Sequence, residues 1–277
     1  MAGRLAGKVA IITGASRGLG QYCAVGYARE GATVVIAART ETETDPRLPG
    51  TIHQTAEMVK AAGGEAFPVV CNVGDNESVL EMTKQVLDRY GQIDILMTNA
   101  AVQPPGGIAT IQLRHWELEF RVNVHGAFYC IRAALPSMIE RKSGNIINVS
   151  SIGALGGSHY GATKRAVEAM TVGLANEMRE NGIAVNCMKP VRGIDTPGVR
   201  YPRARGQVGG ADRPQEGPRT PSDSYVEAAI LLAMQTPDTF TGQVLHDAQL
   251  IERLADEETK NRFRKMNPPE WVAAMKA

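Results

Sequence analysis

Two residues four positions apart, Tyr160 and Lys164, form the first pair with the potential for acid–base chemistry. On a helix this spacing places both side chains on one face. A lysine ammonium beside a phenol favours the phenolate and lowers the pKa of the tyrosine, as a general acid or base at neutral pH requires. Exposed tyrosine–lysine pairs at this spacing are also common. Here the pair opens a predicted helix and follows a strand ending in Ser150 and Ser151, which favours the catalytic interpretation.

A glycine-rich turn, Thr-Gly-Ala-Ser-Arg-Gly-Leu-Gly at residues 13–20, follows the first predicted strand. Gly14, Gly18 and Gly20 allow a tight turn and let the backbone approach a pyrophosphate. The N-terminus of the next helix favours the negative charge of that group. A plain strand-to-helix turn would also use glycine, but the position after the first strand favours dinucleotide binding.

The second predicted strand ends at Ala38 and Arg39, without a carboxylate. In dinucleotide-binding folds an Asp or Glu at this place binds the ribose hydroxyls of NAD, whereas an arginine suits the 2′-phosphate of NADP. Arg17 and Arg39 could both reach that phosphate, which predicts NADP(H) as the cofactor. The alternative is that both are solvated surface arginines.

The elements that must position these residues are short β-branched runs alternating with longer helical stretches. The predicted strands are residues 9–12, 33–36, 67–70, 93–97, 145–149, 183–185 and 242–245. Their nearly continuous apolar runs suit parallel strands buried on both faces. Helices are expected over 78–90 and 162–180, each followed by a helix-ending glycine. The alternation predicts an α/β fold, a doubly wound, Rossmann-like parallel sheet of about seven strands with helices on both faces, in a single domain over 1–277.

Two segments interrupt this alternation. Residues 40–50 are polar and contain prolines, so a loop is expected there, before a helix from about 52 to 62. Residues 198–222 are rich in proline and arginine and are expected to form a long loop, either a lid over the substrate or a solvated segment. The C-terminal extension, about 250–277, is expected to begin as a charged helix and contains Trp271.

Bulk composition is that of a soluble globular protein, with 43% hydrophobic and 21% charged residues. The formal net charge of +1 gives no reason to expect a nucleic acid partner. The cysteines lack paired spacing and lie in apolar runs, and His159 has no partner at ligand spacing. Buried reduced thiols, a surface or hydrogen-bonded histidine and no metal site are therefore expected. No apolar stretch approaches the ~20 residues that cross a bilayer, and no signal-peptide pattern is present, so a cytoplasmic location without membrane contact is expected.

Together, the glycine-rich turn, the serine after the fifth strand and Tyr-Gly-Ala-Thr-Lys resemble the short-chain dehydrogenase/reductase superfamily, in its single-domain branch. The similarity runs from about Leu5 to Asp247 and includes residues 98–101, Asn123 and residues 190–196. It implies an oxidoreductase that moves a hydride between NADP(H) and a ketone, an aldehyde or a secondary alcohol. It also implies a homodimer or homotetramer.

The resemblance further implies roles for single residues. Tyr160 would give a proton to a ketone or take one from an alcohol, and Lys164 would tune Tyr160 and hydrogen-bond the nicotinamide ribose. Ser151 would orient the substrate oxygen, and Asn123 would hold a water in a proton relay through Lys164. The residues implied to bind the cofactor are Gly14, Ser16, Arg17, Gly18, Leu19, Gly20, Arg39, Asn72, Val73, Asn99, Ala100, Tyr160, Lys164, Pro190, Ile194 and Thr196.

The sequence departs from the family pattern at several of these positions. Asn72 stands where the family has aspartate, and Val191 follows Pro190 where glycine is typical. Ser151 lies only nine positions before Tyr160, fewer than in the family. Because rigid elements carry both hydroxyls, the shorter segment is expected to leave them in place and to widen the site for bulky ketones. The alternative is that the serine is displaced.

Two other functions remain open. A regulatory protein could keep the dinucleotide site and lack turnover, an alternative that the shortened segment favours. An epimerase or dehydratase acting on sugar nucleotides would need a substantial C-terminal substrate domain, and only about thirty residues follow Asp247.

Overall fold

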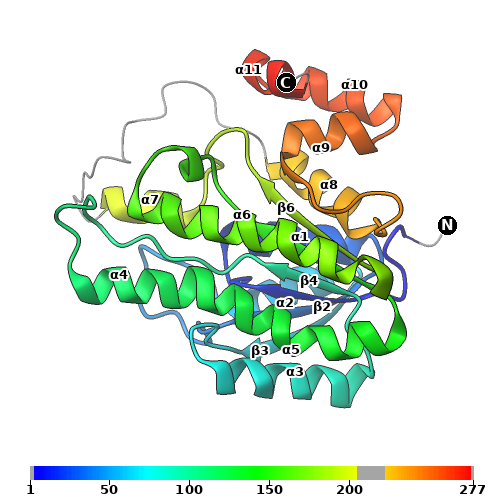
Figure 1. Ribbon diagram of the computed structural model, residues 1–277, viewed down its shortest axis with the longest axis horizontal. Coiled ribbons are helices and arrows are strands. Elements are labelled where there is room, and N and C mark those ends of the chain that lie inside the picture. The colour runs from blue at the N-terminus through cyan, green and yellow to red at the C-terminus, as the bar shows by residue number, and fades with distance from the viewer. Residues whose placement is uncertain (1–2, 205–221, 276–277) are drawn as a thin grey trace.

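The computed structural model of the chain describes residues 3–204 and 222–275. Seven parallel strands form one sheet in the order β3-β2-β1-β4-β5-β6-β7 (Figure 1). They are β1 (Val9–Thr13), β2 (Thr33–Ala38), β3 (Glu65–Val70), β4 (Ile95–Thr98), β5 (Gly144–Val149), β6 (Ile183–Lys189) and β7 (Val244–His246). The strand order reverses beside β1, so the topological switch point lies between β1 and β4. Ligands of doubly wound sheets bind outside the carboxyl ends of the strands at this point.

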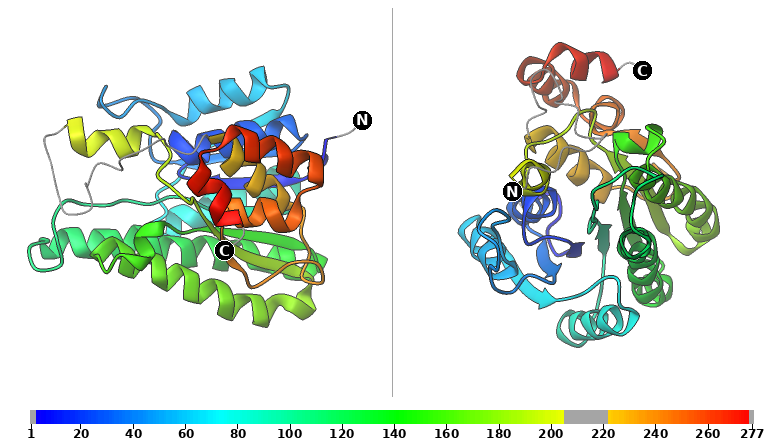
Figure 2. Two further views of the ribbon diagram at one scale, coloured as in Figure 1. Left: turned by 90° about the horizontal axis from the view of Figure 1, so that it is seen from above. Right: turned by 90° about the vertical axis from the view of Figure 1, so that its left-hand side faces the viewer.

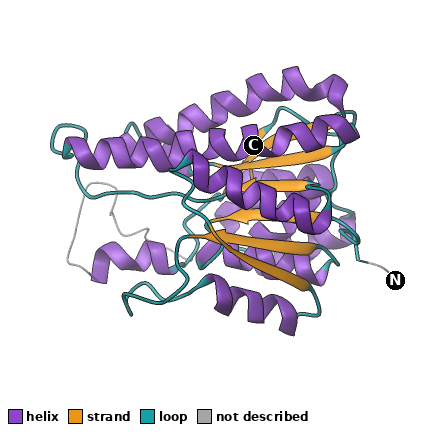
Figure 3. Cartoon of the chain, turned by 90° about the horizontal axis from the view of Figure 1, so that it is seen from below, coloured by secondary structure: helices purple, strands orange, loops and turns teal. Residues whose placement is uncertain are grey.

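Helices cover both faces of the sheet, as Figure 3 shows. They are α1 (Gly18–Arg29), α2 (Ile52–Ala61), α3 (Asn76–Tyr90), α4 (Leu113–Phe120), α5 (Gly126–Arg141), α6 (His159–Met178), α7 (Pro197–Ala204), α8 (Ser222–Ala233), α9 (Asp247–Leu254), α10 (Glu257–Met266) and α11 (Pro269–Met275). One core cluster joins the sheet to α1, α2, α8 and α9, and the other joins it to α3, α5 and α6. The predicted doubly wound, Rossmann-like fold is confirmed.

Neighbouring residues of a strand enter opposite core clusters. Ile11 packs into the cluster under α3 and α5, and Ile12 packs into the cluster under α1 and α8. Side chains alternate between the faces of a strand, and both faces of this sheet are covered, so every residue of β1 is buried. This is why the strands read as continuous apolar runs in the sequence.

Local capping sets the helix boundaries. At the start of α2, Thr51 and Gln54 form a reciprocal capping box, and α3 ends at Gly91 in the left-handed conformation. Helix α6 begins at His159, earlier than predicted, because the Ser158 hydroxyl accepts a hydrogen bond from the Gly161 N–H at 2.9 Å. This cap places Tyr160 in the first turn of α6.

The prediction of a loop over 198–222 was wrong for its first part, because residues 197–204 form the helix α7. Proline suits the first position of a helix because the N–H it lacks would have no partner there. The Thr196 hydroxyl also accepts a hydrogen bond from the Val199 N–H at 3.3 Å, as a capping side chain does. The remainder of the expected loop, residues 205–221, lies outside the described residues.

The C-terminal extension packs as helices α9, α10 and α11 beside α8 (Figure 2). Trp271 of α11 is fully buried in the core cluster under α1 and α8, and its indole N–H donates to Asp247 Oδ2 at 3.0 Å. The extension therefore contributes to the same core as the sheet.

The cysteines, Cys23, Cys71, Cys130 and Cys187, are buried and unpaired, as predicted. Burial raises the pKa of the Cys23 thiol to about 12, so this thiol stays protonated at neutral pH. Within residues 3–204 and 222–275, no helix is long and apolar enough to span a bilayer.

Candidate active site

A cleft of about 1060 Å³ opens at the carboxyl edge of the sheet. Helices α4 and α7 lie beyond this edge (Figure 1). Loops that follow β1, β2, β3, β4, β5 and β6 all contribute to its lining. Of the predicted site residues, all line the cleft except Gly20 and Asn123. One cleft therefore holds both the glycine-rich turn and the tyrosine–lysine pair.

The glycine-rich turn is pressed against its neighbours so closely that side chains would not fit. A Cβ on Gly14 would lie 2.7 Å from Ala100 Cα, and one on Gly20 would lie 2.6 Å from Asn99 Nδ2. Gly14 also has φ +65°, which favours glycine. Helix α1 then begins at Gly18 with no side-chain cap. Its first N–H groups therefore remain available to an anion, so the turn fits a dinucleotide pyrophosphate.

The side chain of Asn99, which directly follows β4, holds the glycine-rich turn by hydrogen bonds. Its Nδ2 donates to the Thr13 carbonyl at 2.8 Å and to the Gly14 carbonyl at 3.3 Å. In return, the Thr13 hydroxyl accepts hydrogen bonds from the N–H groups of Asn99 at 3.0 Å and Ala100 at 3.1 Å. The Asn99 amide thus fixes the shape of the turn as well as lining the cleft.

Two arginines face the end of the cleft beyond β2. Arg17 donates to the Gly50 carbonyl at 2.7 Å, while its buried Nε has no hydrogen-bond partner among the described residues. Burial lowers the pKa of Arg17, the charge of Glu43 opposes this shift, and the charge of Arg39 adds to it. The 40–50 loop also contributes Thr40 and Leu48 to the lining, which the sequence did not predict. Paired arginine charges at one end of a cleft suit a phosphate.

The loops after β3 and β6 complete this half of the cleft. The Asn72 side-chain oxygen accepts a hydrogen bond from the Gly74 N–H at 3.2 Å, and Val73 is buried beside it. After β6, the Val191 N–H donates to Asp247 Oδ1 at 2.8 Å, which holds the turn next to Pro190. Three residues of the loop after β6 were predicted to contact the cofactor, and all three line the cleft, namely Pro190, Ile194 and Thr196.

Tyr160 and Lys164 lie at the other end of the cleft, where Lys164 is buried and Tyr160 is half-buried. Lys164 Nζ donates to the Val149 carbonyl at 2.8 Å and lies 5.6 Å from the Tyr160 ring centroid. Burial lowers the pKa of Lys164 to about 8. Burial also raises the pKa of Tyr160, the charge of Glu119 raises it further, and a hydrogen bond with Ser151 opposes this.

The expected lowering of the Tyr160 pKa by Lys164 was therefore wrong. The reason is that the ammonium of Lys164 donates to a backbone carbonyl rather than to the phenol. Desolvation then dominates, because the phenolate is the charged form that burial disfavours. The phenol of Tyr160 is consequently neutral, and a neutral phenol is a proton donor.

The two serines after β5 have different surroundings. The Ser150 hydroxyl donates to Glu168 Oε1 at 2.7 Å, in a buried cluster that also holds Lys189. The Ser151 hydroxyl accepts a hydrogen bond from the Gly153 N–H at 3.0 Å and interacts with Tyr160. Ser151, and not Ser150, is thus the serine whose hydroxyl meets the tyrosine.

The short segment between Ser151 and Tyr160 is accommodated as a single 3₁₀ turn, Ile152–Leu155, followed by two glycines. This turn lies directly on the start of α6, because a Cβ on Gly161 would be 2.5 Å from the Gly153 carbonyl oxygen. A shortened loop with little side-chain bulk therefore joins the two hydroxyl-bearing residues.

Asn123 lies below the cleft in a π-helical turn, Arg121–His125, between α4 and α5. Its Oδ1 accepts from the Val102 N–H at 2.8 Å, and its Nδ2 donates to the Val102 carbonyl at 2.9 Å and to the Thr163 hydroxyl at 3.1 Å. The side-chain amide of Asn123 is thus occupied by protein partners.

The sequence did not predict one wall of the cleft, which consists of Val102, Gln103, residues 106–108 and His159. The loop residues follow β4, and the rule that clefts form beyond the carboxyl ends of strands was the signal that could have found them. His159 is a buried, hydrogen-bonded histidine, one of the two states expected for it.

Comparison with known proteins agrees with this arrangement. A model of the short chain dehydrogenase family matches residues 8–204. Hydroxysteroid dehydrogenase-like protein 2 of Danio rerio is 31% identical over 91% of this chain, which spans only 59% of the length of that relative. The (2S)-[(R)-hydroxy(phenyl)methyl]succinyl-CoA dehydrogenase subunit BbsD of Thauera aromatica is 32% identical over 86% of this chain and 94% of its own.

A solved structure shares the fold as well. The crystal structure of a metagenomic short-chain oxidoreductase in complex with NADP has a TM-score of 0.71 at 27% identity, covering 88% of this chain and 97% of that one. The matched family segment runs from β1 through α7 and contains the glycine-rich turn, Ser151, Tyr160 and Lys164. The chain therefore belongs to the short-chain dehydrogenase/reductase family of oxidoreductases, whose members bind a nicotinamide dinucleotide.

Proposed function

We propose that the protein catalyses hydride transfer between NADP(H) and a bulky ketone or secondary alcohol, with Tyr160 as the general acid or base. The observation that carries this proposal is the meeting of Ser151, Tyr160 and Lys164 in the cleft that also holds the glycine-rich turn. When bound, the reduced nicotinamide supplies the hydride that the carbonyl carbon receives.

The residues of this chain supply the proton and the orientation. The carbonyl oxygen accepts hydrogen bonds from the hydroxyls of Ser151 and Tyr160, and the phenol proton of Tyr160 passes to that oxygen to complete the alcohol. Lys164, 5.6 Å from the Tyr160 ring centroid, stabilises the resulting phenolate. Because the Asn123 Nδ2 donates to two protein groups, a relay water at Asn123 would bind to an oxygen of this residue.

The serine assignment separates this mechanism from one in which the shortened segment displaces the serine. Ser151→Ala is expected to lower kcat strongly, because the substrate oxygen loses a donor, whereas Ser150→Ala mainly loosens the buried contact with Glu168. Steady-state turnover and thermal unfolding of both variants decide between the two arrangements. The assignment of Ser151 is contradicted if only Ser150→Ala loses turnover, or if both variants keep it.

The preference for NADP(H) rests on Arg17 and Arg39, and the related crystal structure holds NADP. Charge-assisted hydrogen bonds from two guanidinium groups favour a 2′-phosphate. The Ala38→Asp and Arg39→Ala double substitution is expected to raise the affinity for NADH relative to NADPH. Calorimetric titration with both dinucleotides measures this, with Arg29→Ala on α1 as the matched control. Tighter binding of NADH by the unchanged protein would refute the preference.

A bulky substrate suits the half of the cleft near Tyr160. The lining there is uncharged or small, from Ile108, Ile152, Gly153, Gly156 and Val199. The relatives named above carry names that refer to a hydroxysteroid and to a hydroxy(phenyl)methyl-succinyl-CoA, both large alcohols. A panel of small and bulky ketones and alcohols, followed at 340 nm with NADPH and NADP⁺, tests this class. Tight dinucleotide binding without turnover on any substrate would support the regulatory alternative.

The proposal includes assembly into two or four copies and a cytoplasmic location. Exposed apolar side chains lie on α4, α5 and α6, namely Leu118, Phe128 and Val172. Such side chains would favour contact between copies of the chain where they form one patch. The buried, unpaired thiols suit a reducing compartment. Light scattering on the purified protein measures the mass of the assembly.

A further inference from the structure

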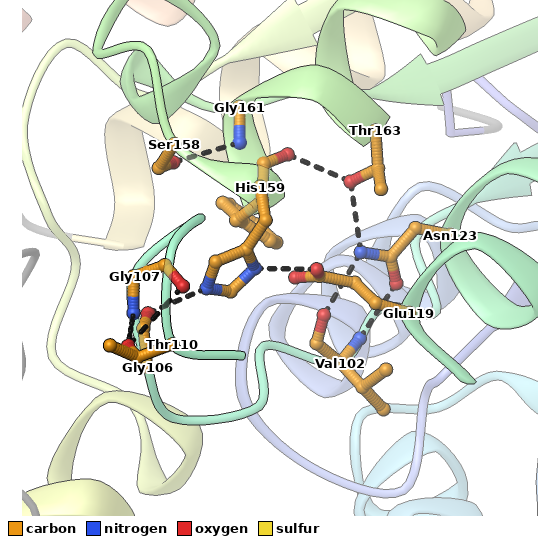
Figure 4. Close-up of polar contacts among 11 residues, drawn as sticks. Val102, Gly106, Gly107, Thr110, Glu119, Asn123, Ser158, His159, Gly161 and Thr163 are labelled. Carbon is orange, nitrogen blue, oxygen red and sulfur yellow. Dashed lines mark hydrogen bonds and ion pairs between the residues drawn. The ribbon is translucent and has the colours of Figure 1, made fainter. Parts of the chain in front are cut away.

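A buried imidazole–carboxylate pair adjoins the catalytic tyrosine. His159 Nδ1 lies 2.6 Å from Glu119 Oε2, and His159 Nε2 lies 2.8 Å from the Gly106 carbonyl oxygen. Figure 4 shows the imidazole ring between these two groups. The histidine opens α6, the carboxylate belongs to α4, and the carbonyl belongs to the loop between β4 and α4. The ring therefore connects three separate elements.

The two partners of the imidazole determine how many protons the pair holds. The Gly106 carbonyl can only accept, so Nε2 of His159 carries a proton. Nδ1 either carries a second proton and faces a carboxylate, or it accepts a proton from a protonated Glu119. In both cases the pair has no net charge. This suits its setting, because the Glu119 side chain is fully buried and only 3% of the His159 side chain is exposed.

A second contact holds the same loop from below. The amide of Asn123 binds both the N–H and the carbonyl of Val102, and it also donates to Thr163. The Thr163 hydroxyl in turn donates to the Tyr160 carbonyl at 2.7 Å. The loop from Val102 to Gly106 is thus attached at both ends to the first turns of α6, which carry Tyr160 (Figure 4).

This loop forms one wall of the cleft, and the shortened segment contributes to another part of the lining. Gln103, Gly106, Gly107 and Ile108 line the cleft from one side, whereas glycines dominate the lining from residues 152–157. Ile108 is also 63% exposed, so protein packing alone does not hold the loop tip. Val102 packs against the core cluster under α3 and α5, whereas the loop near Gly106 is held by its polar attachment to His159.

We propose that His159 is a positioning residue, which together with Glu119 fastens the 102–108 loop to the start of α6 and so sets the width of the substrate cleft. The proposal rests on the proposed function, which makes this cleft the substrate site, but the attachment of the loop to α6 can be measured without turnover. The substrate class it concerns is a bulky carbonyl compound whose far end contacts Gln103 and Ile108.

The test removes both partners together. A single His159→Leu substitution would leave the Glu119 carboxylate buried and unpaired, which can unfold a protein, whereas replacing a buried pair by apolar residues is often tolerated. The main variant is therefore His159→Leu with Glu119→Leu. Glu119→Gln is the conservative variant, because its amide can donate to Nδ1 while Nε2–H still donates to Gly106. Glu117→Gln, exposed on the same helix, is the matched control.

Two measurements are made on each full-length variant, amide hydrogen exchange over residues 102–112 and steady-state kinetics with bulky ketones. The double variant is expected to exchange faster in this loop and to show a KM raised about tenfold, the worth of a lost hydrogen bond to a charged group. Dinucleotide affinity should change little. Glu119→Gln and Glu117→Gln should keep the slow exchange and the low KM.

Three results would overturn the inference. The first is unchanged exchange in the double variant, and the second is faster exchange with an unchanged KM. The third is a loss of dinucleotide affinity parallel to the rise in KM, which indicates a general structural effect. If the unchanged protein turns over no substrate, the proposed function fails, and the exchange measurement alone still decides whether the pair holds the loop.

Discussion

At the scale of residues, the cleft exposes a conflict between burial and charge. Catalysis as proposed needs a phenol and an ammonium close together, yet Lys164 is buried and Tyr160 is half-buried, so both charged forms lose contact with water. Burial raises the pKa of Tyr160 and lowers that of Lys164 to about 8, so both groups are driven towards their neutral forms. A neutral phenol suits proton donation to a ketone. Lys164 must keep its proton to stabilise the phenolate that follows.

This conflict predicts a stability cost from Lys164. Its ordinary pKa is 10.5 and its folded-state pKa is about 8, so between these values the unfolded chain binds a proton that the folded chain does not. Its contribution to the free energy of unfolding therefore rises with pH across that window. Lys164→Met is expected to be more stable than the unchanged protein at pH 7, by at most on the order of 3 kcal/mol. Loss of the hydrogen bond to the Val149 carbonyl reduces this gain at every pH, and the difference should shrink towards pH 10.

Urea unfolding at a series of pH values measures this difference. Lys265→Met, an exposed position on α10, serves as the control and should show no such trend. Comparing each variant with the unchanged protein at the same pH cancels the titration of buried tyrosines and cysteines. Two results would contradict the predicted cost of burying Lys164. One is a stability difference that stays constant with pH, and the other is a Lys164→Met variant that is less stable than the unchanged protein at every pH.

Residue types and spacing were enough to identify the pair Tyr160 and Lys164, because four positions on a helix define a shared face. The partnership of His159 with Glu119 had no such signal, since forty positions separate the two and only the packing of α4 against α6 joins them. The raised pKa of Tyr160 could not be predicted from the sequence either, because it depends on how far the fold buries the phenol.

At the scale of elements, strands were easier to predict than loops. Continuous apolar runs marked the strands because both faces of the sheet are covered. Helix α7 was missed because Pro202 and the arginines of the 198–222 segment favour a loop, although Thr196 and Pro197 are good residues for a helix start. The 40–50 loop was predicted, but not that Leu48 would line the cleft, since that depends on how the loop folds back over Arg17.

The C-terminal helix α11 is predicted to support the cofactor end of the cleft through one carboxylate. Asp247 accepts hydrogen bonds from the Trp271 indole and from the Val191 N–H beside Pro190. Trp271→Phe keeps an aromatic ring but leaves the Asp247 oxygen without this donor, at a cost of about 1–3 kcal/mol. A lower unfolding temperature and weaker dinucleotide binding are expected.

Thermal unfolding and a dinucleotide titration measure both effects. Trp116→Phe on α4 is the matched control, because Trp116 packs against Phe120 and has no part in this contact. Equal stability of the two variants would show that the indole hydrogen bond contributes nothing to the packing of α11.

At the scale of the whole molecule, the parallel sheet explains why residues distant in the chain act together. The residues after β1, β4, β5 and β6 meet because parallel strands place their carboxyl ends at one edge. The alternation of strands and helices was enough to predict this topology. The shape of the cleft beyond the edge was not, because it is set by the loops that follow the strands.

The most direct test of the central claim is the rate of hydride transfer in Tyr160→Phe, followed at 340 nm in a single turnover with NADPH and a bulky ketone. The variant keeps the ring and removes only the phenol hydroxyl, so dinucleotide affinity should be nearly unchanged. The transfer rate should fall by about 10²–10⁴-fold, the usual contribution of a general acid. A Tyr160→Phe protein that binds the dinucleotide and transfers hydride at the unchanged rate would contradict the account.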